Sequence, residues 1–262
     1  MRSKIPISGK INKVGFQDLH QGVLMRKAII ITGASRGIGA ATARILAKDH
    51  NLVLVARRKN DLQQIADEVI KKHGNVLIMP CDVTVEEQVR ETVKLTEEKF
   101  GRIDILINNA GIGSYKRVDE FTLDEFKHII DVNIIGTFLF TKYVILGMIE
   151  RKKGQVINVA SVAGLSGFKN GSAYSASKFA VVGFSESLRE DVKQHGIAVS
   201  IVCPGAVNTS FGGKKIQETV TREFLLEPED VARTLKYLVD ESETANTKLV
   251  ELKPRKREKF RE

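Results

Sequence analysis

Short aliphatic runs, which recur between segments with helical patterning, constrain the fold of this chain more than any other feature. Strands that read as near-continuous aliphatic runs are typical of a parallel sheet buried on both faces. Alternation of such runs with helical segments predicts an α/β, doubly wound fold, with a parallel sheet of about seven strands and helices on both faces. The predicted strands are 28–32, 52–55, 76–79, 103–107, 156–159, 199–202 and 248–252.

Helix starts are marked by local capping signals. Thr84 and Thr122 each stand three residues before a glutamate, which is the spacing of a capping box. Pro228 suits the first turn of a helix, because the N–H that proline lacks has no partner there. We therefore predict helices that begin directly after Thr84 and Thr122, and one that begins at Pro228.

The domain organisation follows from length and from the location of charge. A chain of 262 residues with 42% hydrophobic content can bury one large core. We predict one Rossmann-fold catalytic domain over 25–252, with a mobile lid near 207–221. Residues 1–24 form an N-terminal extension, either an upstream-start extension or a surface arm, and 253–262 form a basic tail.

The net charge of +9 resides mainly in these two end segments, which carry seven of the nine net charges. The body lacks the basic excess that nucleic-acid binding requires, so no nucleic-acid partner is expected. No apolar stretch is expected to reach the ~18 residues of a membrane span, and the basic start lacks the apolar centre of a secretory signal. With two cysteines and no disulfide framework, the expectation is a cytoplasmic protein without a membrane partner.

A glycine-rich loop, Thr32–Gly39, follows the first predicted strand and leads into a helix. Glycines in this context allow a tight turn and close approach of the backbone to a pyrophosphate, which the helix N-terminus attracts. A purely structural glycine turn is the alternative, but the strand–loop–helix order favours a dinucleotide site.

Tyr174 and Lys178 stand four residues apart, so they project from one face of a helix, and Ser161 lies thirteen residues upstream. A phenol of pKa near ~10 is a poor acid–base group at neutral pH. A neighbouring ammonium favours the phenolate and is expected to lower that pKa. The three residues, with the dinucleotide loop, indicate redox chemistry between carbonyls and alcohols.

These motifs together resemble the short-chain dehydrogenase/reductase family, in its subgroup of about 250-residue single-domain oxidoreductases. The resemblance covers about residues 25 to 252. It is carried by the TGxxxGxG loop, the NNAG segment, an aspartate after the third strand, an asparagine in Asp131-Val-Asn-Ile, a serine, the YxxxK pair and a Pro-Gly turn. The matching positions are Thr32, Gly33, Gly37, Gly39, Asn108–Gly111, Asp82, Asn133, Ser161, Tyr174, Lys178, Pro204 and Gly205.

The resemblance implies roles for four catalytic residues. Tyr174 would donate a proton to the substrate oxygen, and Ser161 would hold that oxygen by a hydrogen bond. Lys178 would lower the pKa of Tyr174 and bind the ribose hydroxyls of the cofactor, and Asn133 would place a water in a proton relay toward Lys178. The implied cofactor-binding positions are Gly33, Ser35, Arg36, Gly37, Ile38, Gly39, Arg57, Asp82, Val83, Asn109, Ala110, Gly111, Tyr174, Lys178, Pro204, Gly205, Val207 and Thr209.

The end of the second predicted strand indicates which dinucleotide is used. An NAD site usually carries a carboxylate there, whereas this chain reads Leu54-Val-Ala-Arg57. A planar guanidinium suits a 2′-phosphate, so Arg57 and Arg36 predict NADP(H). The five histidines form no ligand pattern with the cysteines, and no metal is expected.

The expected function is therefore an NADP(H)-dependent oxidoreductase that interconverts a carbonyl and a secondary alcohol. A 3-oxoacyl-acyl-carrier-protein reductase is the specific alternative, although the chain lacks the DGG segment usual near the end of such enzymes. A non-catalytic NADP(H)-binding sensor is the alternative of another class, and the four catalytic residues argue against it.

The substrate pocket is expected between 113–118, 162–168 and the lid. A small-molecule carbonyl or alcohol is the predicted partner. The predicted lid has no apolar face long enough for a bulky steroid. The predicted helices 126–148 and 179–192 carry apolar residues on more than one face, which predicts a homodimer or homotetramer. A thicker monomer core is the alternative. The residues concerned are Phe138, Phe140, Val144, Val181, Val182 and Phe184.

Overall fold

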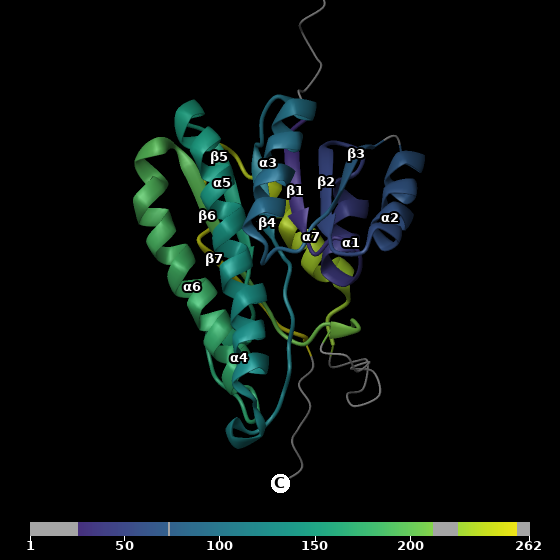
Figure 1. Cartoon of the computed structure of the whole chain (residues 1–262). Helices are drawn as coiled ribbons and strands as arrows, with labels where there is room; N and C mark the ends of the chain where they lie inside the picture. The colour runs from purple at the N-terminus through teal and green to yellow at the C-terminus, as the bar shows by residue number, and fades with distance from the viewer. Residues whose placement is uncertain (1–25, 73, 212–224, 256–262) are drawn as a thin grey trace, which may run out of the picture.

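The computed structural model describes residues 26–72, 74–211 and 225–255. Its centre is a seven-stranded sheet in the order β3-β2-β1-β4-β5-β6-β7, and every pairing between neighbouring strands is parallel (Figure 1). This confirms the predicted doubly wound Rossmann-type fold. The strands are β1 (Ala28–Thr32), β2 (Asn51–Ala56), β3 (Asn75–Pro80), β4 (Ile105–Asn108), β5 (Gly154–Val159), β6 (Ile197–Pro204) and β7 (Leu249–Leu252).

The strands lie where the aliphatic runs predict them, with differences at their ends. β4 begins two residues later than predicted, because the Asp104 carboxylate accepts a hydrogen bond from the backbone N of Ala28 at 2.8 Å. β6 extends two residues further at each end than its apolar run. The aliphatic pattern of the sequence identifies the buried centre of a strand. The hydrogen bonds to its partner strands decide at which residue the strand ends.

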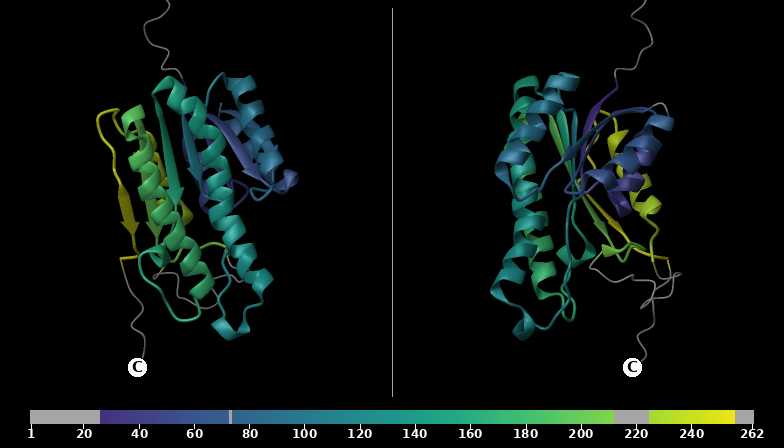
Figure 2. Two further views of the ribbon diagram at one scale, coloured as in Figure 1. Left: turned by 60° about the vertical axis from the view of Figure 1, so that its left-hand side comes forward. Right: turned by 45° about the vertical axis from the view of Figure 1, so that its right-hand side comes forward.

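Helices cover both faces of the sheet (Figure 2). One layer is formed by α1 (Gly37–Leu46), α2 (Lys59–Lys71) and α7 (Pro228–Val239). The other layer is formed by α3 (Glu86–Phe100), α4 (Leu123–Ile130), α5 (Gly136–Arg151) and α6 (Ser172–Val192). Each layer packs a separate apolar cluster against one face of the sheet, so the side chains of the inner strands are buried on both sides, whereas the edge strands β3 and β7 are partly exposed.

Two of the three predicted helix starts are confirmed. Thr122 caps α4 in a capping box with Glu125, and Pro228 is the first residue of α7. The prediction at Thr84 is wrong, because α3 begins at Glu86 and has no side-chain cap. The Thr84 hydroxyl instead donates to the Asp82 carboxylate at 2.7 Å, which also accepts from the Thr84 backbone N.

One helical stretch, Leu123–Arg151, is long and apolar enough by length and composition to cross a membrane. It comprises α4, the π-helical turn η2 (Asp131–Ile135) and α5. The expectation that no stretch reaches this length was therefore wrong. Half of its most apolar window is buried inside the fold, where α5 packs on β4, β5 and α3.

The carboxyl ends of the strands meet at one edge of the sheet, and the strand order reverses between the parallel neighbours β1 and β4 at its centre. In doubly wound folds this point opens a crevice between the loops that follow the strands. The predicted extension 1–24, residues 212–221 of the predicted lid and residues 256–262 of the basic tail lie outside the described residues.

Candidate active site

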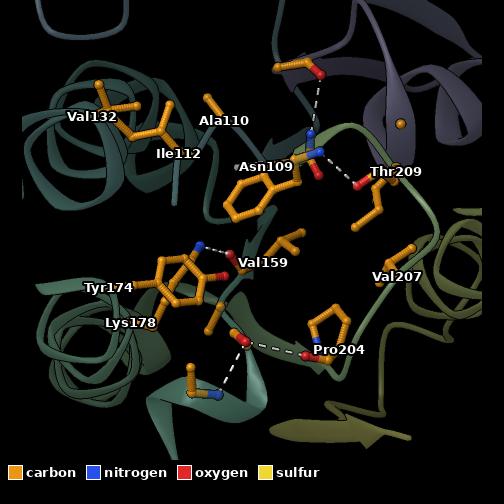
Figure 3. Close-up of a pocket in the computed structure, with 18 of the residues that line it drawn as sticks. Asn109, Ala110, Ile112, Val132, Val159, Tyr174, Lys178, Pro204, Val207 and Thr209 are labelled. Carbon is orange, nitrogen blue, oxygen red and sulfur yellow. Dashed lines mark hydrogen bonds between the residues drawn. The ribbon is translucent and has the colours of Figure 1, made fainter. Parts of the chain in front are cut away.

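A cavity of about 830 Å³ lies at the carboxyl edge of the sheet, beneath the loops that follow β1, β4, β5 and β6 (Figure 3). All but two of the residues predicted to bind cofactor or catalyse line its wall. The exceptions are Gly39 and Asn133, which lie directly behind the wall.

The loop between β1 and α1 needs its glycines. Gly33 and Gly37 have φ angles of +66° and +55°, a region that residues with a Cβ rarely adopt. A Cβ on Gly33 would also lie 2.9 Å from the Cα of Ala110, and one on Gly39 only 2.4 Å from the carbonyl oxygen of Gly33. The loop therefore curves closely against β4 and brings the N-terminus of α1 to the cavity, which fits a pyrophosphate.

Thr32 and Asn109 tie this loop to the end of β4. The Thr32 hydroxyl accepts hydrogen bonds from the backbone N of Asn109 at 3.0 Å and of Ala110 at 2.9 Å. The Asn109 side-chain amide donates to the carbonyl of Thr32 at 2.9 Å. These hydrogen bonds connect the glycine loop directly to the NNAG segment at the end of β4.

Tyr174, in the first turn of α6, lies in the middle of the cavity wall with 8% of its surface exposed. Its ring contacts the rings of Tyr115 and Phe211 edge-on, each at 5.7 Å between centroids. Burial raises the pKa of its phenol, and the hydrogen bond with Ser161 lowers it only in part.

The expected lowering of the Tyr174 pKa by Lys178 is therefore not found. The Lys178 Nζ lies 5.9 Å from the centroid of the Tyr174 ring and donates to the carbonyl of Val159 at 2.9 Å (Figure 3). Burial lowers the pKa of the Lys178 ammonium to about 8, because the charged form loses its water. Because Lys178 is partly neutral near pH 8, it favours the phenolate of Tyr174 less than a fully charged ammonium would.

Ser161 follows β5 and faces the same part of the cavity. Its hydroxyl donates to the carbonyl of Pro204 at 3.3 Å and accepts from the backbone N of Ala163 at 3.1 Å. The bond to Ala163 caps the short 3₁₀ turn η3 (Val162–Gly164), which fixes the serine rotamer. The thirteen-residue spacing to Tyr174 thus brings two hydroxyls together from a strand end and a helix start.

Asn133 lies in η2, 1% exposed, and its side-chain amide is occupied by protein partners. Its oxygen accepts from the backbone N of Ile112 at 2.8 Å, and its nitrogen donates to the carbonyl of Ile112 and to the hydroxyl of Ser177, each at 2.9 Å. The side chain therefore holds the loop after β4 rather than facing the cavity. A Cβ on Gly111 would lie 3.2 Å from the Asn133 oxygen and 3.6 Å from the Lys178 Nζ, so both side chains border the space beside Gly111.

Charged groups gather at the end of the cavity under β2 and β3. Arg36, Arg57 and Asp82 all line it, and Arg36 donates to the hydroxyl of Ser210 at 3.2 Å. Burial works to raise the pKa of Asp82, but hydrogen bonds from Thr84 and the nearby Arg57 hold it below its usual range. Arg58 also lines the cavity, but its guanidinium forms an ion pair with Asp61 at 2.6 Å at the start of α2.

The turn after β6 lines another side of the cavity. The backbone N of Gly205 donates to the carbonyl of Leu252 at 2.7 Å, so β7 fixes the Pro204–Gly205 turn. Val207 pairs with Leu226 in a short bridge, and the methyl of Thr209 would lie 3.2 Å from a Cβ on Gly37. The start of the predicted lid thus rests on the glycine loop.

Glu251 and Lys253 are among the cavity residues that sequence reasoning missed, and they form an ion pair beside Gly205. Nothing in the local sequence indicates them, because they reach the cavity only through the pairing of β7 with β6. Phe211 lay within the predicted lid, but its ring contact with Tyr174 could not be read from spacing.

Comparison with known proteins agrees with this geometry. The family profile described as short chain dehydrogenase matches residues 27–219. The chain belongs to the short-chain dehydrogenase family. An uncharacterized oxidoreductase of Staphylococcus aureus is 33% identical over 233 residues, which are 88% of this chain and 99% of the relative. A 3-oxoacyl-[acyl-carrier-protein] reductase of Synechocystis is 34% identical over 228 residues, 85% of this chain and 92% of that one.

A solved structure of a family member shows the same architecture. The alcohol dehydrogenase of the archaeon Thermococcus sibiricus, complexed with 5-hydroxy-NADP, superposes with a TM-score of 0.82 at 29% identity. The match covers 90% of this chain and all of that one. As a short-chain dehydrogenase, this chain is an oxidoreductase.

Proposed function

We propose that this short-chain dehydrogenase is an NADP(H)-dependent oxidoreductase that interconverts a carbonyl and a secondary alcohol. The observation that carries the proposal is the convergence of Tyr174, Ser161 and Lys178 on the cavity that the glycine loop borders. Hydroxyl groups from two elements there face one space, beside a loop whose backbone fits a pyrophosphate.

Proton transfer belongs to Tyr174 in this proposal. Bound NADPH supplies the hydride that reduces the carbonyl carbon. The phenol of Tyr174 donates its proton to the carbonyl oxygen, while the Ser161 hydroxyl stabilises the charge that develops on that oxygen. A phenol whose pKa is raised by burial is protonated at neutral pH, which suits it to act as the acid in reduction.

Lys178 and Asn133 support this step. Lys178 would bind the ribose hydroxyls of the cofactor, next to the phenol whose pKa burial raises. We assign Asn133 to the water relay toward Lys178. Because its side chain is hydrogen-bonded to Ile112, it acts in the relay by holding Ile112 in place. The mechanism requires no metal.

The preference for NADP(H) rests on Arg57 and Arg36. Both line the end of the cavity at β2, where the adenosine ribose of a dinucleotide would bind, and no carboxylate terminates β2 there. The guanidinium of either can form paired hydrogen bonds to a 2′-phosphate. The Thermococcus sibiricus enzyme, bound to an NADP derivative, supports this assignment.

A 3-oxoacyl-acyl-carrier-protein reductase is the second candidate, and the 34% identity with the Synechocystis enzyme favours it. A non-catalytic sensor of NADP(H) has less support, because all four catalytic residues are present. The substrate is then a small carbonyl or alcohol, without a nucleic-acid or membrane partner, and the protein acts in the cytoplasm.

We propose that the enzyme is a homodimer or homotetramer, although, of the predicted residues, several belong to the monomer core and Phe138 is exposed. Phe140, Val144 and Val181 are at most 1% exposed and belong to the monomer core, as the alternative reading held. Apolar side chains outside that core do occur on the same helices. They are Ile135 (40% exposed), Phe138 (42%), Leu146 (59%) and Phe179 (47%).

Steady-state reduction tests the proposed function. The purified protein is assayed for oxidation of NADPH and of NADH against ketones, aldehydes, 3-oxoacyl thioesters and sugars. Turnover with NADPH and at least one carbonyl, at a higher kcat/KM than with NADH, is the expected result. Cofactor binding without turnover of any carbonyl or alcohol would instead support the sensor.

A further inference from the structure

Three aromatic side chains extend from Tyr174 toward the mouth of the cavity. The ring of Tyr115 meets that of Tyr174 at an angle of 86°, and it meets the ring of Phe168 at 60°, both at 5.7 Å between centroids. Phe211 contacts Tyr174 from another side at 5.7 Å and 62°. Edge-on contacts of this kind form a continuous apolar wall that begins at the reacting hydroxyl.

Part of this wall faces solvent although it lines a concave site. Tyr115 is 45% exposed, Phe168 48% and Leu165 37%. Clustered exposed apolar side chains in a cavity mark a binding surface, because an apolar ligand that covers them releases their water.

Charge is distributed unevenly along the cavity. Arg36, Arg57 and Asp82 lie at the cofactor end, and Glu251 and Lys253 lie beside β7. Aliphatic side chains complete the apolar wall around these rings, and the cavity residues that form it are Ile112, Tyr115, Val162, Leu165, Phe168 and Phe211. These side chains are uncharged, and the ammonium of Lys178 lies beside Tyr174, 5.9 Å from the centroid of its ring. A carboxylate placed against the apolar side chains would lose water without gaining a hydrogen-bond partner from them.

Two glycines hold the rings in place. A Cβ on Gly171 would lie 2.5 Å from the ring of Phe168, and a Cβ on Gly113 would lie 2.6 Å from the ring of Phe211. The φ angles of both glycines lie outside the left-handed region, so space rather than backbone conformation excludes a side chain. Each ring can therefore take its position only because the neighbouring residue is a glycine, which has no side chain.

From these contacts we propose that the site takes a neutral ketone with an aromatic or alicyclic ring next to the carbonyl carbon, or the corresponding secondary alcohol. The inference rests on the function proposed above and names the substrate class of the same site. Tyr115, Phe168 and Phe211 are its specificity-determining residues, because they touch the ring of the substrate while Tyr174 and Ser161 bind its oxygen.

The first test compares matched substrates with the wild-type enzyme and NADPH. Acetophenone and cyclohexanone represent the proposed class, and 2-butanone, pyruvate and a 3-oxobutyryl thioester represent small, charged and acyl substrates. The ring ketones are expected to have a kcat/KM at least about tenfold higher than the others, which is the scale of discrimination that apolar contacts provide. A higher kcat/KM for pyruvate or the thioester would overturn the inference and leave the proposed function standing.

Variants then separate the wall from the catalytic residues. Phe168→Ala and Gly113→Ala are expected to lower kcat/KM for acetophenone about tenfold through KM, with a smaller effect on 2-butanone. Tyr115→Phe keeps the ring and is expected to stay within about twofold of the wild type. Tyr237→Ala, which removes an exposed aromatic ring on α7, is the matched control and should change neither substrate.

A binding measurement keeps the two proposals distinguishable. Ligand-observed NMR with the NADP⁺-loaded enzyme compares 1-phenylethanol with lactate, independently of turnover. Binding of 1-phenylethanol that weakens in Phe168→Ala supports the inference even if no carbonyl is reduced, a result that would refute the proposed function alone. Equal binding of both alcohols, or no effect of Phe168→Ala, would overturn the inference.

Discussion

The hydroxyl of Tyr174 is the atom on which the proposed chemistry depends. Tyr174→Phe removes the proton that is transferred but keeps the ring and its contacts with Tyr115 and Phe211. We expect kcat to fall by about 10²- to 10⁴-fold, the usual contribution of general acid catalysis, while NADPH binding is unchanged. Stopped-flow turnover and fluorescence titration of NADPH measure the two effects. Turnover close to that of the wild type would contradict the assignment.

Arg57 is the residue that should distinguish the two dinucleotides. A charge-assisted hydrogen bond contributes about 1.5–3 kcal/mol, so Arg57→Ala should weaken NADPH binding by roughly 10- to 100-fold. NADH lacks the 2′-phosphate and should bind the variant as it binds the wild type. Isothermal titration with both cofactors measures the difference, and Arg58→Ala is the neighbouring control because Arg58 pairs with Asp61. Equal weakening for both cofactors would show that Arg57 acts on the fold instead.

At the scale of elements, His50 couples the connection between α1 and β2 to the end of α7. The ring is 7% exposed, and neither ring nitrogen has a hydrogen-bond partner among the described residues. Burial first, and then the charge of Lys27, lower the pKa of His50, while Asp240 and Asp49 oppose this shift.

This shift predicts acid destabilisation. The unfolded chain binds a proton at His50 near its ordinary pKa of 6.5, whereas the folded chain binds it only at lower pH. Stability contributed by neutral His50 is therefore present above pH 6.5 and decreases as the pH falls below it. The wild type should lose several more degrees of Tm than His50→Leu between pH 7 and pH 5, measured by calorimetry. Parallel losses in both proteins would exclude His50 as the cause.

Two threonines show how much of an element can be predicted from its sequence. Thr84 and Thr122 have the same capping-box spacing, yet only Thr122 caps a helix. α3 begins at Glu86 with Val85 as its N-cap, so Thr84 lies one residue too early to cap it, and Asp82 accepts hydrogen bonds from the Thr84 hydroxyl and backbone N. The capping-box spacing therefore indicates a possible helix start, and the turn formed just before the helix decides where it begins.

The whole molecule was predictable to the level of its sheet. Aliphatic runs defined the inner strands β1, β2, β4, β5 and β6, because these are buried and their pattern needs no knowledge of their neighbours, whereas the edge strands β3 and β7 are only partly buried. The site was predictable where one motif specifies both a backbone and a chemistry, as at Gly33 and Tyr174. The contributions of Glu251 and Phe211 were not, since they arise from strand pairing and ring packing between distant segments.

Assembly is the prediction at this scale. Leu146 and Phe138 are exposed on α5, and a second copy of the chain would remove them from water. Leu146→Lys is expected to shift the protein toward a monomer in light scattering at micromolar concentration. Ile70→Lys, at a residue of α2 that is 54% exposed, is the control and should leave the molar mass unchanged. A wild-type protein that is already monomeric would contradict the proposed oligomer.

The pairing of β7 with β6 places Lys253 on the wall of the cavity, whereas Lys152 lies at the opposite edge of the sheet, just before β5. Chemical coupling to a solid support through these two lysines would therefore give two orientations of the same catalyst. Attachment through Lys152 leaves the mouth directed away from the surface, and attachment through Lys253 directs it toward the surface. An immobilised form intended for turnover should be anchored at the edge where the strands begin.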